Sequence, residues 1–138
     1  MMIVSACLAG VRCRYNGQAY PVPKVVELVE SGQALPLCPE VLGGLPTPRA
    51  CAEMLHGKVV TQDGTDVTSF YLAGAQTALE IATLVACKKA ILKARSPSCG
   101  CDKIYDGSFA GRLVEGDGIF AARLKAQGIA VCTEEELV

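Results

Sequence analysis

The apolar run Met2-Ile3-Val4-Ser5-Ala6-Cys7 decides the fold that we predict for this chain. The run is short, contains branched side chains and leads into a glycine-bearing loop, which is typical of a buried β-strand. Two later runs repeat this arrangement: Ala34-Leu35-Pro36-Leu37 before Cys38, and Ala90-Ile91-Leu92-Lys93 ahead of Cys99. If these runs are neighbouring parallel strands, all three thiols reach the same edge of one sheet, where open α/β proteins place their chemistry.

Helical patterns alternate with the predicted strands. We expect a short helix at about residues 23–31, which starts at a proline, and another at about 117–127 before a last strand at about 128–132. The longest helix, at about 67–86, is apolar over much of its circumference, so broad burial against the sheet is expected. This alternation predicts an α/β fold, a three-layer Rossmann-like sandwich with a mainly parallel sheet of about four to five strands.

The segments between these elements contain few regular patterns. Residues 39–49 are punctuated by proline and glycine, which excludes a long regular element. A short accessory strand is expected at about residues 58–62, and Cys51 is placed in a short helix before it. The glycine-rich stretch 96–118 shows little regular structure, and loops of that length inside a domain are usually functional.

The composition fits a globular protein that handles a small molecule. The chain has 138 residues, of which 51% are hydrophobic and 20% charged, with a net charge of −1. Near-neutrality supplies no basic surface for polymeric nucleic acid and no polybasic face for a membrane. The first apolar run is too short for a signal peptide, and no stretch is long enough to span a bilayer. We therefore expect one cytoplasmic domain, a monomer or homodimer, whose eight cysteines stay reduced.

The cysteines are the strongest chemical signal in the sequence. Soft thiolates bind iron–sulfur clusters, zinc and cuprous copper, although free cysteine is also among the most commonly buried residues. No compact C-x-x-C pair exists, so ligands would come from three separate loops. The leading candidates are Cys7, Cys38 and Cys99, because each follows a predicted strand. Cys13 and Cys101 lie in the same loops and are competing candidates. Cys87 is interpreted as core packing, and Cys132 lies at the end of the last strand. Cys51 is a weak candidate.

Two polar residues stand beside the candidate ligands. Glu40 follows Cys38 by two residues in a loop rich in proline and glycine, where a fixed carboxylate could move protons or hold a substrate N–H. Ser96 precedes Cys99 by three residues, and it could donate a hydrogen bond to a ligand or only cap the turn at Pro97. Cations flank the same loops and could offset the negative charge of a cluster or simply lie on the surface; they are Arg12, Arg14, Arg49, Lys93 and Arg95.

Several motifs occur in a defined order along nearly the whole chain. They are Ser5-Ala6-Cys7-Leu8-Ala9-Gly10, Cys38-Pro39-Glu40, Gly64-Thr65-Asp66-Val67-Thr68, Ser96-Pro97-Ser98-Cys99-Gly100 and Ile104-Tyr105-Asp106-Gly107-Ser108-Phe109. Together they resemble a bacterial domain long known only as domain of unknown function five-two-three. That domain is the conserved part of thiouracil desulfidases of the TudS type. The chain is similar to the short form of this family, so residues 1–138 are expected to be a single desulfidase-like domain.

The resemblance implies a [4Fe–4S] cluster held by Cys7, Cys38 and Cys99. Its fourth iron would take the sulfur of a thiolated nucleobase such as thiouracil, and sulfide would be released without net electron transfer. The family's catalytic carboxylate and serine map onto Glu40 and Ser96, which would move protons and orient the base. Because exposed clusters oxidise, an aerobic preparation can lose the cluster or carry another metal in its place.

Two other readings of the cysteines compete with a desulfidase. A non-catalytic metal-binding or sulfur- or persulfide-handling protein would need the thiols but would have no use for Glu40 and Ser96. A structural domain would bury its cysteines in the core. The single histidine, His56, precedes a glycine in a predicted turn, which weakens any hydrolase reading that needs a Ser-His-Asp arrangement.

Overall fold

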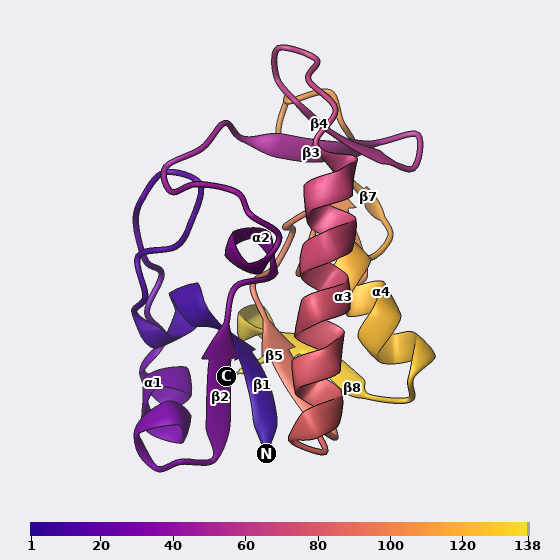
Figure 1. Cartoon of the computed structure of the whole chain (residues 1–138). Helices are drawn as coiled ribbons and strands as arrows, with labels where there is room; N and C mark the ends of the chain where they lie inside the picture. The colour runs from indigo at the N-terminus through magenta and orange to yellow at the C-terminus, as the bar shows by residue number, and fades with distance from the viewer. Residues whose placement is uncertain (138) are drawn as a thin grey trace.

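A sheet of four parallel strands forms the centre of the protein, as seen in a computed structural model that describes residues 1–137 (Figure 1). The strands are β1 (Met2–Ser5), β2 (Ala34–Leu37), β5 (Lys89–Leu92) and β8 (Ala130–Thr133), in the order β2-β1-β5-β8. All neighbouring pairs are parallel. The chain builds outward from β1 in both directions, so the topological switch point lies between β1 and β5. The predicted end of the domain, Val138, lies outside the described residues.

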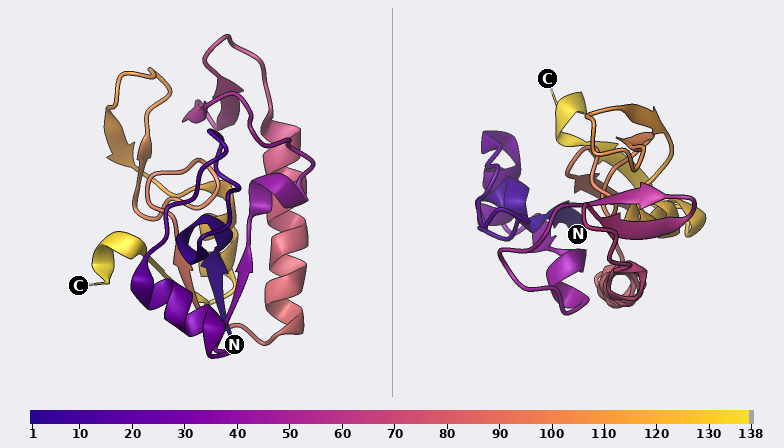
Figure 2. Two further views of the ribbon diagram at one scale, coloured as in Figure 1. Left: turned by 90° about the vertical axis from the view of Figure 1, so that its left-hand side faces the viewer. Right: turned by 90° about the horizontal axis from the view of Figure 1, so that it is seen from above.

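Helices cover both faces of this sheet, which confirms the three-layer prediction (Figure 2). On one face lie α3 (Thr68–Leu84) and α4 (Ile119–Ala126), and on the other lies α1 (Pro23–Glu30). Large side chains seal each interface: Phe120 and Leu124 are fully buried on the first face, and Val25 on the second. Burying a side chain of this size stabilises the fold by about 1.5–3 kcal/mol.

The long helix α3 is buried along one face only, so the expectation of broad burial was wrong. Its buried residues are mostly small, and Leu84 on the outer face is 84% exposed. Small residues let the backbone of α3 approach its neighbours closely, because no side chain separates them. A Cβ atom added at Gly74 would lie 1.8 Å from the carbonyl oxygen of Pro39, the first residue of the short helix α2 (Pro39–Leu42). The backbones of α2 and α3 are therefore in direct contact.

Two hairpins complete the fold above the sheet, and the sequence reading missed most of their structure. The predicted accessory strand is β4 (Lys58–Thr61), which pairs antiparallel with an unpredicted β3 (Ala52–Leu55). Cys51 precedes β3 and is not helical, so its placement in a helix was wrong. The turn is tight because His56 and Gly57 both adopt positive φ angles, 51° and 77°.

The second hairpin lies within the stretch that showed little regular structure. It pairs β6 (Lys103–Tyr105) with β7 (Leu113–Glu115). All three residues of β7 are exposed, so the alternation of apolar and polar residues that reveals a half-buried strand is missing. Helix α2 was also not predicted. It is a single turn, too short to produce a helical pattern within the proline-rich segment 39–49.

Short 3-10 segments follow two of the central strands: η1 (Ala6–Ala9) after β1, and η2 (Glu134–Glu136) after β8. Gly10 ends η1 in the left-handed conformation, with φ 98°. Among residues 1–137, no helix combines the length and apolar character that crossing a bilayer requires.

Candidate active site

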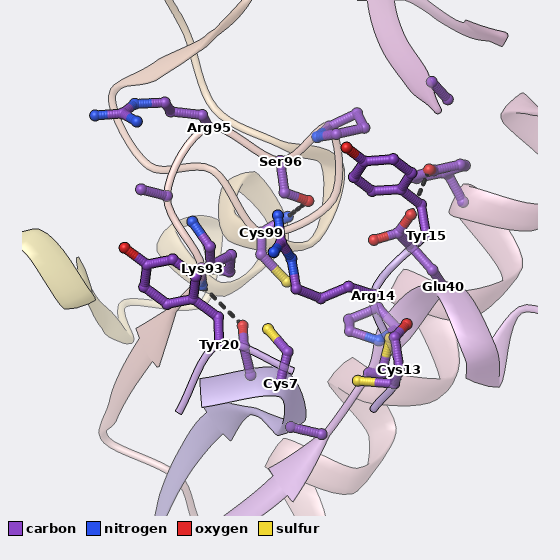
Figure 3. Close-up of a pocket in the computed structure, with 18 of the residues that line it drawn as sticks. Cys7, Cys13, Arg14, Tyr15, Tyr20, Glu40, Lys93, Arg95, Ser96 and Cys99 are labelled. Atoms are coloured by element: carbon purple, nitrogen blue, oxygen red, sulfur yellow. Dashed lines mark hydrogen bonds between the residues drawn. The ribbon is translucent and has the colours of Figure 1, made fainter. Parts of the chain in front are cut away.

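A cavity of about 290 Å³ opens at the carboxyl edge of the sheet, over the switch point between β1 and β5. Each leading cysteine reaches it from a different element. Cys7 lies in η1 directly after β1, Cys38 lies between β2 and α2, and Cys99 lies in the loop after β5. The structure therefore brings the three thiols to one cavity, as the parallel order of the strands requires. Figure 3 labels Cys7 and Cys99 among the residues that line it.

Two further cysteines line the same cavity. The thiol of Cys13 interacts with the thiols of both Cys7 and Cys38, so it lies between two leading candidates. Cys51 reaches the cavity from the segment before β3. Of the two competitors named from the sequence, Cys13 thus belongs to the cavity, while Cys101 is absent from its lining.

The other three cysteines lie outside the cavity. Cys87 is buried in the core beneath α3 and donates its thiol to the carbonyl oxygen of Lys89 at 3.2 Å, as expected for a packing residue. Cys132 packs, partly buried, on the face of the sheet that α1 covers. Cys101 donates its thiol to the carbonyl oxygen of Val131 at 3.7 Å.

Cys101 also belongs to a small acidic group at the base of the second hairpin. Among residues 1–137, Cys101, Asp102 and Asp117 form the only trio of His, Cys, Asp or Glu whose ligand atoms all lie within 4.8 Å of one another. The Nζ atom of Lys125 lies 2.8 Å from Asp102 Oδ1 and 2.9 Å from Asp117 Oδ1. The ammonium group of Lys125 therefore already holds the position that a bound cation would need.

Three of the cavity thiols, those of Cys13, Cys38 and Cys99, have raised pKa values and are poor acids. Burial raises the pKa of Cys99 to about 12. A hydrogen bond with Cys13 and burial raise the pKa of Cys38 above its usual range. For Cys13, the hydrogen bond with Cys38 lowers the pKa, but a hydrogen bond with Cys7 and burial outweigh it and raise the pKa to about 11. Three neighbouring thiolates thus need a positive partner, and a coordinated metal supplies one because it deprotonates a thiol outright.

Glu40 is the only carboxylate among the residues that line this cavity. It lies in the single turn of α2, and its side chain is 16% exposed. Oε1 accepts a hydrogen bond from the Tyr71 hydroxyl at 2.5 Å, and Nε of Arg49 lies 3.5 Å from the same oxygen. The sequence reading missed Tyr71. The available signal was a tyrosine within an apolar helix, since a buried phenol usually has a polar partner.

Ser96 fixes the loop that carries Cys99 and also faces the cavity. Its Oγ atom accepts hydrogen bonds from the backbone N–H groups of Ser98 and Cys99, both at 3.0 Å. A hydroxyl group has two acceptor positions and one donor. Because both acceptor positions are engaged, Ser96 can act toward a bound molecule only as a hydrogen-bond donor.

Four cationic side chains line the cavity. The cavity lining includes Arg14, Arg49, Lys93 and Arg95, whereas Arg12 is exposed elsewhere on the same loop. Lys93 is held by Glu134, whose Oε2 lies 2.9 Å from its Nζ. The Lys93 ammonium also lies 4.6 Å from the centre of the Tyr20 ring. Of the five flanking cations named from the sequence, four therefore line the cavity. Three of them already pair with a carboxylate: Arg49 with Glu40, Lys93 with Glu134 and Arg95 with Glu135.

Two buried polar atoms beside this cavity make no hydrogen bond, although Arg49 Nε lies 3.5 Å from Glu40 Oε1 as an ion pair. Within residues 1–137, the only buried side-chain nitrogen or oxygen atoms with no hydrogen bond are Arg49 Nε and Ser98 Oγ. Ser98 is 1% exposed and directly precedes Cys99. An unpaired buried donor is costly, by about 1–3 kcal/mol, so such atoms are expected where a bound group completes the site.

Comparisons with known proteins agree with this geometry. The family model described as 2-thiouracil desulfurase matches residues 2–136. The chain is 43% identical over 147 aligned positions to the uncharacterized protein YbbK of Bacillus subtilis (strain 168), and the alignment covers 99% of this chain and 97% of that protein. It is also similar to a solved structure described as the [4Fe-4S]-dependent thiouracil desulfidase TudS (DUF523Vcz). That match has a TM-score of 0.93 and 44% identity, and it covers 99% of this chain and 91% of the other.

Proposed function

The chain belongs to the 2-thiouracil desulfurase family, and we propose that it is an iron–sulfur-dependent enzyme that removes sulfur from a thiolated nucleobase such as thiouracil. The net reaction replaces the thione sulfur with the oxygen of water: the thione and one water molecule give the carbonyl compound and one molecule of hydrogen sulfide. Carbon keeps its oxidation state, so no external oxidant or reductant is needed. We propose that the protein acts in the cytoplasm as a monomer or homodimer.

The residues at the cavity fit a [4Fe–4S] cluster. Soft thiols are the ligands that hold such clusters, and the proposed ligands are Cys7, Cys38 and Cys99. The unpaired hydroxyl of Ser98 fits a thiolate at Cys99, because a thiolate sulfur accepts hydrogen bonds while a thiol accepts them weakly. When bound, the cluster supplies a Lewis acid that attracts the sulfur of the substrate.

Glu40 and Ser96 offer the complementary groups that a pyrimidine base needs. Oε2 of Glu40 is an acceptor for a ring N–H or for a proton of the attacking water. Ser96, restricted to donation, can bind an acceptor on the same ring. We propose that Glu40 takes a proton from water as it adds to the ring carbon, and that Ser96 orients the base.

One observation carries this proposal. At a single cavity, thiols from three separate loops lie with one carboxylate and one serine that can only donate. A protein that only binds metal has no need of the carboxylate and the serine. The combination therefore supports catalysis over metal storage.

The proposal is tested on protein purified without oxygen. We expect a brown protein with about four irons per chain that releases sulfide from 4-thiouracil and forms uracil in equal amount. Glu40→Ala is expected to keep the iron and its visible absorption but to lose turnover by about 10²- to 10⁴-fold. Full iron loading with no sulfide from any thiolated pyrimidine would refute the proposed function, and full turnover by Glu40→Ala would remove that residue from the mechanism.

A further inference from the structure

The Glu40 carboxylate is held from one side only. Both groups that approach it, the Tyr71 hydroxyl and Nε of Arg49, lie on the same oxygen, Oε1. Within residues 1–137, no hydrogen bond engages Oε2. Figure 3 shows the carboxylate directed into the cavity on the side of Cys99 and Ser96. The two oxygens are therefore not equivalent, since one is bound to the protein and the other is free.

Tyr71 is well placed to keep this arrangement. It lies in the first turn of α3, is 3% exposed and packs with Ala52 and Val59 of the first hairpin. Burial, the charge of Glu40 and the hydrogen bond to that carboxylate raise the pKa of Tyr71 above its ordinary value. The phenol consequently stays protonated and remains a donor to Oε1.

The contact between α2 and α3 sets the distance that this hydrogen bond spans. A Cβ atom at Gly43 would lie 2.0 Å from the carbonyl oxygen of Phe70, and one at Gly74 would lie 1.8 Å from that of Pro39. Tyr71 and Gly74 are three residues apart, so they lie on the same face of α3. The close backbone contact therefore fixes the start of α3 against the turn that carries Glu40.

We propose that Tyr71 is the positioning residue of Glu40: it binds Oε1 from α3 and thereby presents Oε2 to the substrate. Arg49 supports the same orientation from the loop that precedes β3. This inference rests on the proposed function for its catalytic consequence, but the orientation itself is a property of the chain alone. Misplacement of a reacting group by about 1 Å can cost about 10²-fold in rate.

A double-mutant cycle tests the inference in the cluster-loaded enzyme. Tyr71→Phe keeps the ring in the core and removes only the hydroxyl. We expect it to lower kcat by about 10- to 10²-fold with little change in KM and unchanged iron content. In a Glu40→Ala background, the same substitution is expected to cause no further loss, because Tyr71 acts through Glu40. Losses that multiply, or an unchanged kcat in Tyr71→Phe, would overturn the inference.

The matched control removes a hydroxyl from the same helix without touching the cavity. Ser69 is exposed in the first turn of α3, so Ser69→Ala is expected to keep the kcat of the parent protein. Equal losses in Ser69→Ala and Tyr71→Phe would assign the effect to the helix and overturn the positioning role.

Crystal structures of the cluster-free proteins separate this inference from the proposed function. In Tyr71→Phe we expect the Glu40 carboxylate to rotate away from α3, whereas the parent protein keeps Oε1 on Tyr71. An unchanged carboxylate in the variant would overturn the inference even if desulfidation is confirmed. If the parent protein releases no sulfide, the proposed function fails, and the rotation of Glu40 still decides whether Tyr71 positions it.

Discussion

Two groups of cysteine and carboxylate side chains lie in this molecule, and they differ in what the chain leaves unpaired. At the base of the second hairpin, Lys125 bridges Asp102 and Asp117 beside Cys101, so both carboxylates already have a positive partner within the chain. At the carboxyl edge of the sheet, thiols with raised pKa values lie beside a carboxylate with one free oxygen. Both groups bring potential ligand atoms close together. The cavity differs because its thiols and one carboxylate oxygen can still form bonds that no group among residues 1–137 supplies. Unpaired groups, more than the crowding of ligand atoms, therefore mark the reactive site.

Removing single thiols gives the largest expected difference between the two groups. Cys7→Ala, Cys38→Ala and Cys99→Ala should each abolish the cluster, because each removes one of three proposed ligands from a buried site. Cys101→Ala should keep both iron and sulfide release. Iron content and visible absorption of anaerobically purified proteins measure the effect. A Cys101→Ala protein without iron, or a Cys7→Ala protein with a full cluster, would contradict the assignment of the cluster to the cavity thiols.

Ser96→Ala is expected to have the next largest effect. The substitution removes the donor to the substrate and also frees the backbone N–H groups of Ser98 and Cys99. We expect sulfide release to fall by about 10²-fold or more, together with faster loss of the cluster in air. Both are measured by absorption, against Ser108→Ala as the control. Ser108 caps a turn through Asp106 in the second hairpin, outside the cavity lining. Equal behaviour of the two serine variants would count against a role for Ser96.

Lys125→Met should convert the paired group into an unpaired one. Without the ammonium, Asp102 and Asp117 lose the cation that bridges them, and two carboxylates lie beside the buried thiol of Cys101 with no positive partner. We expect the variant to gain weak binding of Zn²⁺ at this group, measured by isothermal titration in the cluster-free protein with the cavity thiols blocked. The parent protein serves as the control. Equal Zn²⁺ binding by both proteins would show that Lys125 does not hold the cation position.

Lys125→Met should also change the free energy of unfolding, and this is the smallest of the expected effects. Its size should depend on pH. The Lys125 ammonium lowers the pKa of Asp102, chiefly through a hydrogen bond. A carboxyl with a lowered folded-state pKa stabilises the protein above its unfolded pKa, and the stabilisation disappears as the pH falls through the folded value. Because Asp102 is 74% exposed, Lys125→Met should lower the free energy of unfolding by less than about 1 kcal/mol at pH 7. Urea unfolding should show a smaller difference at pH 3, and a larger one would contradict this account.

The parallel sheet and the common edge of the three thiols were predictable because they depend on short-range pattern. Apolar runs such as residues 3–5 and 90–92 are buried strands in the structure, close to the expected bounds. Helices between them force the strands to be parallel, so each strand ends at the same edge. The hairpin β6–β7 could not be predicted in this way, because strand β7 is wholly exposed and shows no alternation of apolar and polar residues.

The sequence by itself determined that Cys7, Cys38 and Cys99 share an edge with Glu40 and Ser96, since each lies in the segment that follows a strand whose direction is set by its connections. Only the tertiary structure decided which polar groups are paired. Tyr71 reaches Glu40 across a glycine contact between two helices, and Lys125 reaches Asp102 from another element. These pairings depend on distances of a few ångströms between residues far apart in the chain, and such distances follow from packing, which no local pattern encodes.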